Sequence, residues 1–222
     1  MMTEQTPSLT LYLGRLPGID RKILKSELER FQELFFDECG LVIPIYVLKE
    51  DDTLPENAFQ PEINGEKQAA IEGLAENEFW VYYPYSDITQ PLFDRTWQAR
   101  PSVEPNSGGE AAIVVGGDAE LQIWNENGYD IRTRQGYIPF QVAAQVRTRK
   151  ADFLTPTLVR YSLSQLMESY PDLVAVARQV LSEEELVLEL KSRLEAELSI
   201  KNLPGILEEL LAGKVSPETL QY

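Results

Sequence analysis

The pattern of apolar residues changes near residue 152, and this change constrains the fold more than any other feature of the sequence. Before it, short alternating or β-branched segments are interleaved with turn residues and with two helical patterns. After it, apolar residues recur only at the three- and four-residue spacings of amphipathic helices. We therefore predict an α+β fold, in which a mixed α/β domain with a small sheet and hairpins precedes a C-terminal bundle of short helices.

The expected domain boundaries follow this change. The mixed domain is expected to cover residues 8–150 and the helical domain residues 152–213. Residues 86–110 hold several Pro, Gly and Ser residues and are predicted to form a long surface loop or a small irregular insertion. Residues 214–222 are interpreted as a tail or as the truncated start of a further element.

Within the mixed domain, alternation and turn signals predict strands, and four-residue periodicity predicts helices. The predicted strands are residues 8–13, 41–48, 59–63, 67–71, 79–85, 111–115 and 120–124. Hairpin turns are expected at Asn64-Gly65 and at Gly116-Gly117. One helix is expected to follow an N-cap at Asp20 and to end at Gly40, and another to cover residues 138–149.

Capping signals divide the C-terminal segment into short helices. Thr155 precedes Pro156, and Ser182 precedes Glu185 at capping-box spacing. We expect a helix at residues 172–181 between them, and a last helix capped by Ser199, with Asn202 at its third position and Gly213 at its end. Ser216-Pro217 has the form of one more helix start.

The charge of the chain limits its partners. It holds 36 Asp and Glu against 20 Lys and Arg, for a net charge of -16. This balance argues against nucleic acid and against an anionic membrane surface, and it favours a protein partner with a basic face. The sequence shows no secretion signal and no apolar run of the roughly 20 residues that span a bilayer, so we expect a cytoplasmic chain without direct membrane insertion.

The sequence lacks the usual chemistry of enzymes. It has no histidine and a single cysteine, Cys39, which removes His-based relays, Cys-cluster zinc sites and intramolecular disulfides. We expect no catalytic residue, cofactor or metal, a structural Cys39, and a solvated loop at residues 50–52. An enzyme that uses carboxylates with a divalent metal is the less favoured alternative.

An aromatic segment supplies the candidate partner-binding residues. They are Phe79, Trp80, Tyr82, Tyr83 and Tyr85. Aromatic side chains on both faces of one strand cannot all enter a single core, so one face is a candidate groove for an apolar peptide. In the alternative interpretation both faces are covered, one by a helix and one by residues 86–110.

Two stretches, residues 24–66 and 165–211, contain motifs whose order and approximate spacing match those of a protein family. The matching residues of the first are Glu38, Gly40, Pro44, Asp51 or Asp52, Leu54, Pro55, Asn57, Phe59, Ile63 and Gly65. Those of the second are Tyr170, Pro171, Leu173, Val174, Leu190, Leu194, Leu198, Ser199, Ile200, Lys201, Asn202, Leu203, Ile206, Leu207, Glu208 and Leu210. Together with the Gly128-Tyr129-Asp130 element and the helix after it, they resemble the FHIPEP family of type III secretion and flagellar export-gate proteins.

The resemblance implies binding rather than catalysis. It implies that the chain docks export substrates, their chaperones or a membrane export subunit, that it lies at the inner membrane through a partner, and that it can form a homo-oligomer. Relative to the family, we expect the membrane half and the last subdomain to be missing. A stand-alone adaptor or regulator of the same fold outside secretion is the alternative.

Overall fold

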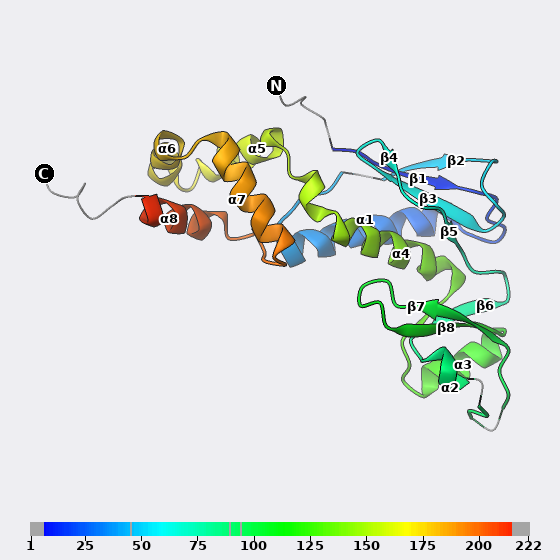
Figure 1. Ribbon diagram of the computed structural model, residues 1–222. Coiled ribbons are helices and arrows are strands. Elements are labelled where there is room, and N and C mark those ends of the chain that lie inside the picture. The colour runs from blue at the N-terminus through cyan, green and yellow to red at the C-terminus, as the bar shows by residue number, and fades with distance from the viewer. Residues whose placement is uncertain (1–6, 45, 89, 94, 215–222) are drawn as a thin grey trace, which may run out of the picture. The chain divides into compact units, whose positions relative to one another are not determined.

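The computed structural model describes residues 7–44, 46–88, 90–93 and 95–214 (Figure 1). The predicted helix start at Ser216-Pro217 and most of the predicted tail therefore lie outside the described residues. The fold is α+β, with helices and two small sheets, as predicted from the sequence. No helix among the described residues is both long and apolar enough to cross a membrane.

The helices and strands are as follows. The helices are α1 (Arg21–Cys39), α2 (Tyr85–Ile88), α3 (Asp118–Glu126), α4 (Arg134–Thr148), α5 (Pro156–Leu166), α6 (Pro171–Val180), α7 (Glu183–Glu195) and α8 (Leu203–Lys214), with a 3-10 turn at Lys150–Phe153. The strands are β1 (Leu9–Leu13), β2 (Val47–Glu50), β3 (Ala58–Ile63), β4 (Glu66–Lys67), β5 (Ile71–Glu72), β6 (Glu78–Val81), β7 (Ala99–Val103), β8 (Glu110–Val115) and β9 (Ile131–Arg132).

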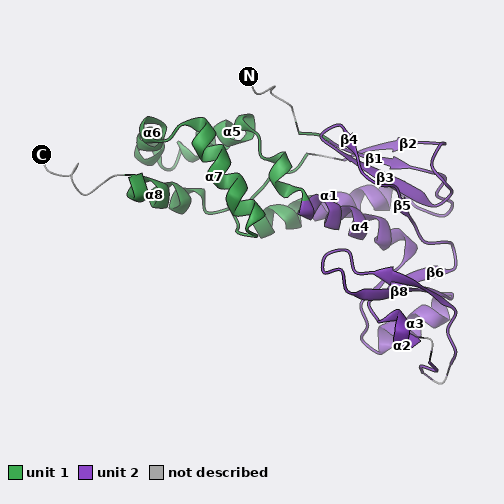
Figure 2. Cartoon of the chain, viewed as in Figure 1, with its two compact units in different colours: residues 1–8, 32–44, 149–222 green, residues 9–31, 45–148 purple. Residues whose placement is uncertain are grey.

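The chain divides into two compact units (Figure 2). The helical unit comprises Met1–Ser8, Gln32–Pro44 and Arg149–Tyr222, and the α/β unit comprises Leu9–Phe31 and Ile45–Thr148. The division differs from a single boundary near residue 150, because the end of α1 and the segment after it cluster with the C-terminal helices.

The first sheet of the α/β unit has the strand order β2-β1-β3-β4, and β5 also pairs with β3. β1 runs parallel to β2 and antiparallel to β3. The predicted turn between β3 and β4 is confirmed, since Asn64 and Gly65 both have positive φ angles, 53° and 82°. The predicted strand at residues 41–48 is wrong for its first half, because pairing with β1 begins only at Val47.

A side-chain contact explains that difference. The Nε2 atom of Gln32 in α1 donates hydrogen bonds to the carbonyl oxygens of Ile43, at 3.2 Å, and Pro44, at 2.5 Å. The segment after α1 therefore satisfies these backbone groups on a helix side chain rather than in a sheet. Gly40 ends α1 with a φ of +78°, as predicted for a helix C-terminus.

The second sheet of the α/β unit is antiparallel, in the order β7-β8-β6-β9. α2 contacts β7 and β8, α3 contacts β9, and α4 contacts β6 and β9. Three predictions fail here. The strand predicted over residues 79–85 ends at Val81, and Tyr85 begins α2. Residues 86–110 contain β7 and part of α2 rather than an irregular insertion, and residues 120–124 belong to α3 rather than to a hairpin strand.

The N-terminus of α3 shows why the hairpin prediction at Gly116-Gly117 failed. The backbone N–H of Gly117 donates a hydrogen bond to Oε2 of Glu120, at 3.0 Å, so the carboxylate reaches back over the first turn of a helix. Leu121 and Trp124 then lie three residues apart on the buried side of α3. A short apolar run is compatible with the two-residue period of a strand and with the 3.6-residue period of a helix. The run at residues 120–124 is too short to distinguish between these two structures.

In the helical unit, α5 packs against α6 and α7, and α6 packs against α8. Two predicted caps are confirmed: Thr155 accepts a hydrogen bond from the N–H of Leu158, and Ser182 forms a capping box with Glu185. The predicted cap of the last helix is corrected. α8 begins at Leu203, Asn202 accepts the N–H of Gly205 at 3.3 Å, and Ser199 instead accepts the N–H of Lys201 at 3.2 Å.

Candidate functional site

The aromatic segment that the sequence singled out is mostly covered. Phe79 is 1% exposed and Trp80 is 0% exposed. Phe79 faces the core cluster formed with Ile88, Trp97 and Trp124, whereas Trp80 packs on Phe140 of α4 with ring centroids 5.0 Å apart. Both faces of β6 are therefore covered, and the structure corrects the partner-binding assignment for Phe79 and Trp80.

The three tyrosines of the segment follow after β6. Tyr82 is 47% exposed and stacks on Trp80. Tyr83 and Tyr85 are half-buried and pack against the same core cluster. A partner-binding role for Tyr82, Tyr83 and Tyr85 stays a prediction.

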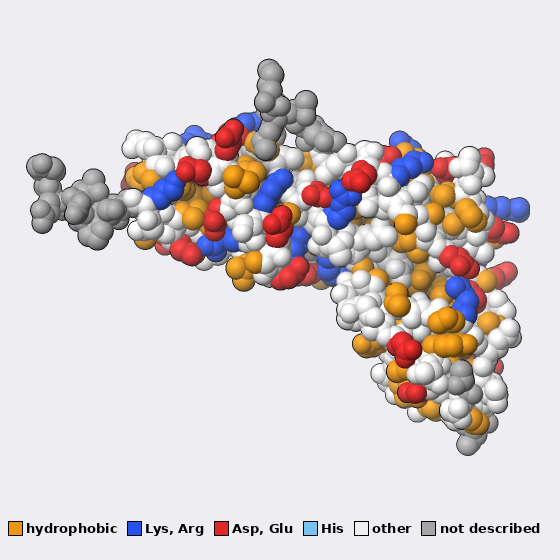
Figure 3. Space-filling model, in the orientation of Figure 1, with side chains coloured by type: hydrophobic (Ala, Val, Ile, Leu, Met, Phe, Trp, Pro, Cys, Tyr) orange, Lys and Arg blue, Asp and Glu red, His pale blue; other side chains and the backbone are white. Residues whose placement is uncertain are grey.

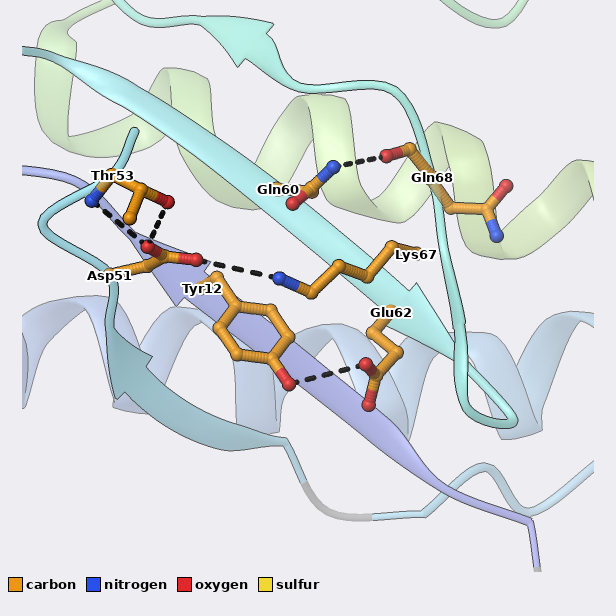
Figure 4. Close-up of polar contacts among 7 residues, drawn as sticks. All are labelled: Tyr12, Asp51, Thr53, Gln60, Glu62, Lys67 and Gln68. Atoms are coloured by element: carbon orange, nitrogen blue, oxygen red, sulfur yellow. Dashed lines mark hydrogen bonds and ion pairs between the residues drawn. The ribbon is translucent and has the colours of Figure 1, made fainter. Parts of the chain in front are cut away.

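The predicted solvated loop at residues 50–52 is held by polar contacts on the first sheet (Figure 4). Asp51 accepts hydrogen bonds from the backbone and side chain of Thr53 and forms an ion pair with Lys67, at 3.4 Å. The hydrogen bonds from Thr53, with a further contribution from Lys67, lower the pKa of Asp51. Lys67 also lies over the ring of Tyr12, 4.1 Å from its centroid, and Tyr12 donates a hydrogen bond to Glu62.

These contacts indicate a structural role for Asp51. Both of its oxygens already have protein partners. Among the described residues, there is no group of three or more Cys, Asp or Glu side chains with the placement of a metal site. Cys39 is buried and its thiol donates to the carbonyl oxygen of Phe35, at 3.2 Å, which fits the predicted structural role.

The helical unit holds an apolar groove with a cavity volume of about 470 Å³. We call it the helical groove. The side chains that define it are Phe36, Val42, Leu158, Tyr161, Leu166 and Tyr170. They come from the end of α1, the segment after it, α5 and the turn that follows α5. Hydrophobic side chains reach the surface among charged ones on the face of the molecule drawn in Figure 3.

Several side chains of the helical groove are open to solvent despite being large and apolar. The exposed fractions are 60% for Tyr161, 58% for Val42, 47% for Tyr170 and 42% for Phe36. Single exposed apolar residues are normal on a protein surface, but several around one concavity mark a binding surface.

A close backbone contact forms one wall of the groove. The N–H of Ile200 donates to the carbonyl oxygen of Cys39, at 2.8 Å. A Cβ atom on Gly40 would lie 2.3 Å from the backbone nitrogen of Lys201, so only glycine fits there. This contact brings residues 200–204 beside the end of α1, where Lys201 forms an ion pair with Asp37, at 2.7 Å.

The helical groove was not predicted from the sequence. Its walls come from three segments, near residues 36–42, 158–170 and 200–204, that are far apart in the chain. One signal was present: Tyr161 and Tyr170 are large aromatic residues in otherwise amphipathic helical segments, off the faces that carry the predicted core.

Comparison with solved structures shows which proteins share this fold. Over 96% of its length the chain is similar to the nonameric SctV-C of enteropathogenic Escherichia coli, with a TM-score of 0.71 and 18% identity. Over 98% of its length it is similar to CdsV of Chlamydia pneumoniae, with a TM-score of 0.78 and 16% identity, and to a chain of the CdsV and CdsO complex of the same organism, with a TM-score of 0.79 and 16% identity. These likenesses show a shared fold.

The family follows from the sequence itself. The model of the FHIPEP family matches residues 3–220, so the chain belongs to the FHIPEP family. The chain spans 62% of the SctV-C chain, 65% of the CdsV chain and 68% of the chain from the CdsV–CdsO complex. No curated protein sequence matches it.

Proposed function

We propose that this chain is a protein-docking domain of a type III export gate, which binds export substrates, their chaperones or other subunits of the secretion apparatus. Membership of the FHIPEP family supports this proposal, together with the fold shared with SctV-C and CdsV. The observation that carries it is the helical groove, because exposed aromatic and aliphatic side chains around a concavity suit protein binding.

The proposal includes the way in which the domain acts and where it acts. It acts by binding and not by catalysis, in the cytoplasm, and it reaches the inner membrane through a partner. Assembly with further copies of the chain is part of the proposal, since the similar SctV-C is nonameric. A bound apparatus protein is likewise expected, since the similar CdsV occurs in a complex with CdsO.

A binding panel tests the function. The immobilised chain is presented with secretion chaperones from the same genome, free and loaded with their export substrates, and binding is followed by biolayer interferometry. We expect at least one of them to bind saturably, and an unrelated protein of equal net charge not to bind the same surface. A folded chain that binds no member of the panel would contradict the docking function.

A further inference from the structure

We propose that the helical groove binds an amphipathic helix of a partner protein, whose apolar face enters the groove and whose flanking Lys or Arg side chains meet the groove's rim. The proposal rests on the docking function proposed above and goes beyond it by assigning the surface and the chemistry of the partner. Three features of the helical unit lead to it: the apolar lining, the absence of strands around it, and the charge of the rim.

The lining favours a helix over an extended peptide. Among the described residues, every residue that lines the groove lies in a helix, in a turn or in an irregular segment, and none lies in a strand. The groove therefore offers no sheet edge to which an extended chain could add by backbone pairing. Recognition must come from side chains, and an amphipathic helix supplies apolar side chains along one face at three- and four-residue spacings.

Two helix C-termini lie at the rim. The last turn of α1 contributes Phe36 to the groove, and the end of α5 contributes Gln165 and Leu166. Neither helix has a basic residue in its last turn, although Lys201 lies beside the end of α1. The C-terminal end of a helix carries a partial negative charge, which favours a basic partner most at the end of α5.

Carboxylates near these two ends add to the effect. Asp37 and Glu38 lie in the last turn of α1, and Glu168 follows the end of α5; all three residues are exposed. Lys201 is the one charged residue that lines the described groove, and its amine is engaged by Asp37 at 2.7 Å. The opposing N-terminus of α8 is capped by Asn202. Since Asp37 neutralises Lys201, the acidic excess of the helical unit, sixteen Asp or Glu against eight Lys or Arg, is what complements a basic partner.

The charge of the chain favours a basic partner over a second copy of this chain as the occupant of the groove. A second copy is itself acidic, with a net charge of -16, so assembly of copies, which the proposed function includes, is expected to use other surfaces. A partner that carries Lys or Arg beside its apolar face gains from apolar contact in the groove and from attraction to the acidic residues around it. Because the rim charges are exposed, we expect them to act mainly on the association rate and to be screened by salt.

A designed peptide tests the proposal without knowledge of the natural partner. The probe is a helical peptide of Leu and Lys in which Leu recurs at positions i, i+3, i+4 and i+7. Its controls are a scrambled peptide of the same composition, which keeps the charge but loses the apolar face, and an analogue with Glu in place of Lys. Binding to the full chain is measured by fluorescence anisotropy at about 50 mM and about 500 mM NaCl, where the screening length differs about threefold.

Two substitutions remove the two most exposed large apolar side chains of the groove without touching the core. Tyr161→Ser and Val42→Ser act at 60% and 58% exposed positions of the groove. Leu188→Ser is the matched control, since Leu188 is 65% exposed in the same unit but does not line the groove. We expect the double groove variant to bind the Leu/Lys probe at least about tenfold more weakly than the natural chain, which is a change of about one decade in Kd, and Leu188→Ser to bind it normally.

Four results would overturn the proposal. They are no binding of the probe, equal binding by the groove variant, equal binding of either control peptide, and self-association of the chain that the groove substitutions abolish. The binding panel separates this proposal from the docking function. If the groove variant still binds the panel members that the natural chain binds, docking stands and the groove assignment fails. If the panel does not bind but the probe does, the docking function fails and the groove assignment stands.

Discussion

The helical unit and the α/β unit have the same net charge but use their large apolar side chains differently. The helical unit holds eight Lys or Arg and sixteen Asp or Glu, and the α/β unit holds twelve and twenty. Among the described residues, nine of the thirteen exposed large apolar side chains belong to the helical unit, although it is the smaller one. Charge therefore does not distinguish the two units, whereas apolar exposure does.

The aromatic residues show the contrast most clearly. In the α/β unit, Trp124 is fully buried and makes edge-to-face contacts with Tyr83, Phe93, Trp97 and Tyr129, with centroids 5.2–5.5 Å apart. In the helical unit, Tyr161 and Tyr170 point to solvent beside the helical groove. Density of aromatics along the sequence thus marks a core here, and isolated aromatics mark the candidate surface.

The largest effect is expected from the α/β core. Trp124→Ala removes the side chain at the centre of the aromatic cluster, and we expect it to lower the free energy of unfolding by about 3–5 kcal/mol, as for other buried Trp-to-Ala changes. Urea unfolding followed by circular dichroism measures it. Tyr82→Ala, at a 47% exposed position, is the control and is expected to cost much less. Equal costs for the two variants would contradict the contrast between core and surface aromatics.

A smaller effect is expected at the wall of the helical groove. Gly40→Ala places a Cβ 2.3 Å from the backbone nitrogen of Lys201 and forces alanine to a φ of +78°. The unfavourable φ alone costs about 1–3 kcal/mol, and the clash adds to it. Gly65→Ala in the α/β unit measures the cost of the positive φ angle without a clash, because Gly65 has a φ of +82° with open space around it. A Gly40→Ala variant no less stable than Gly65→Ala would show that the close contact is absent.

A smaller effect is expected on the stability of each unit in acid. The side chain of Lys214, with further hydrogen bonds from Ser182, lowers the pKa of Glu185 in the helical unit to about 2. Since this pKa lies below its unfolded value of about 4.3, the stability it contributes is complete above that pH and is lost as the pH falls toward 2. We expect Glu185→Gln to melt below the natural chain at pH ~7, and the difference to shrink by pH ~2.5.

The α/β unit offers the matching variant. Burial opposes ionisation of Glu104, but hydrogen bonds from Ser107 and Asn106 outweigh it and lower the pKa of Glu104 to about 2. Glu104→Gln is therefore expected to show the same loss of its melting difference in acid. A melting difference that stays constant with pH in either variant would exclude an ionised carboxylate as the source of that stabilisation.

The smallest effect on stability is expected from the groove itself. Tyr161→Ser changes an exposed side chain, and we expect the free energy of unfolding to change by no more than about 0.5 kcal/mol. Urea unfolding of this variant beside Leu188→Ser measures it. A loss comparable to that of a core substitution would mean that Tyr161 supports the fold instead of facing a partner.

Local signals predicted much of the fold. The periodicity of Leu24, Leu28, Phe31 and Phe35 predicted α1, and all four side chains are buried. Thr155, Ser182 and Gly40 were correctly assigned as helix ends, because these three ends form within a few residues of the chain. Residues 120–124, 41–44 and 46 were misassigned, because a long-range partner, or its absence, decides the state of a short apolar run.

The candidate site was harder to predict for the same reason. Burial of Trp80 depends on Phe140, sixty residues later, and the helical groove depends on three separate segments. The sequence shows which side chains are apolar, but it does not show which of them are buried by a helix that is distant in the chain. Family motifs predicted the fold because they record the whole arrangement, although none of the quoted motif matches marked Tyr161 as surface.

The most direct test of the contrast between the two units is a methyl NMR spectrum of the whole chain, recorded with and without a bound export chaperone or the Leu/Lys probe. We expect shifts at the methyl groups of Val42, Leu158 and Leu166 in the helical groove, and unchanged methyl signals from Val103, an exposed residue of the α/β unit. Shifts confined to the methyl groups around Tyr82, with the groove signals unchanged, would contradict it and return the docking surface to the aromatic segment.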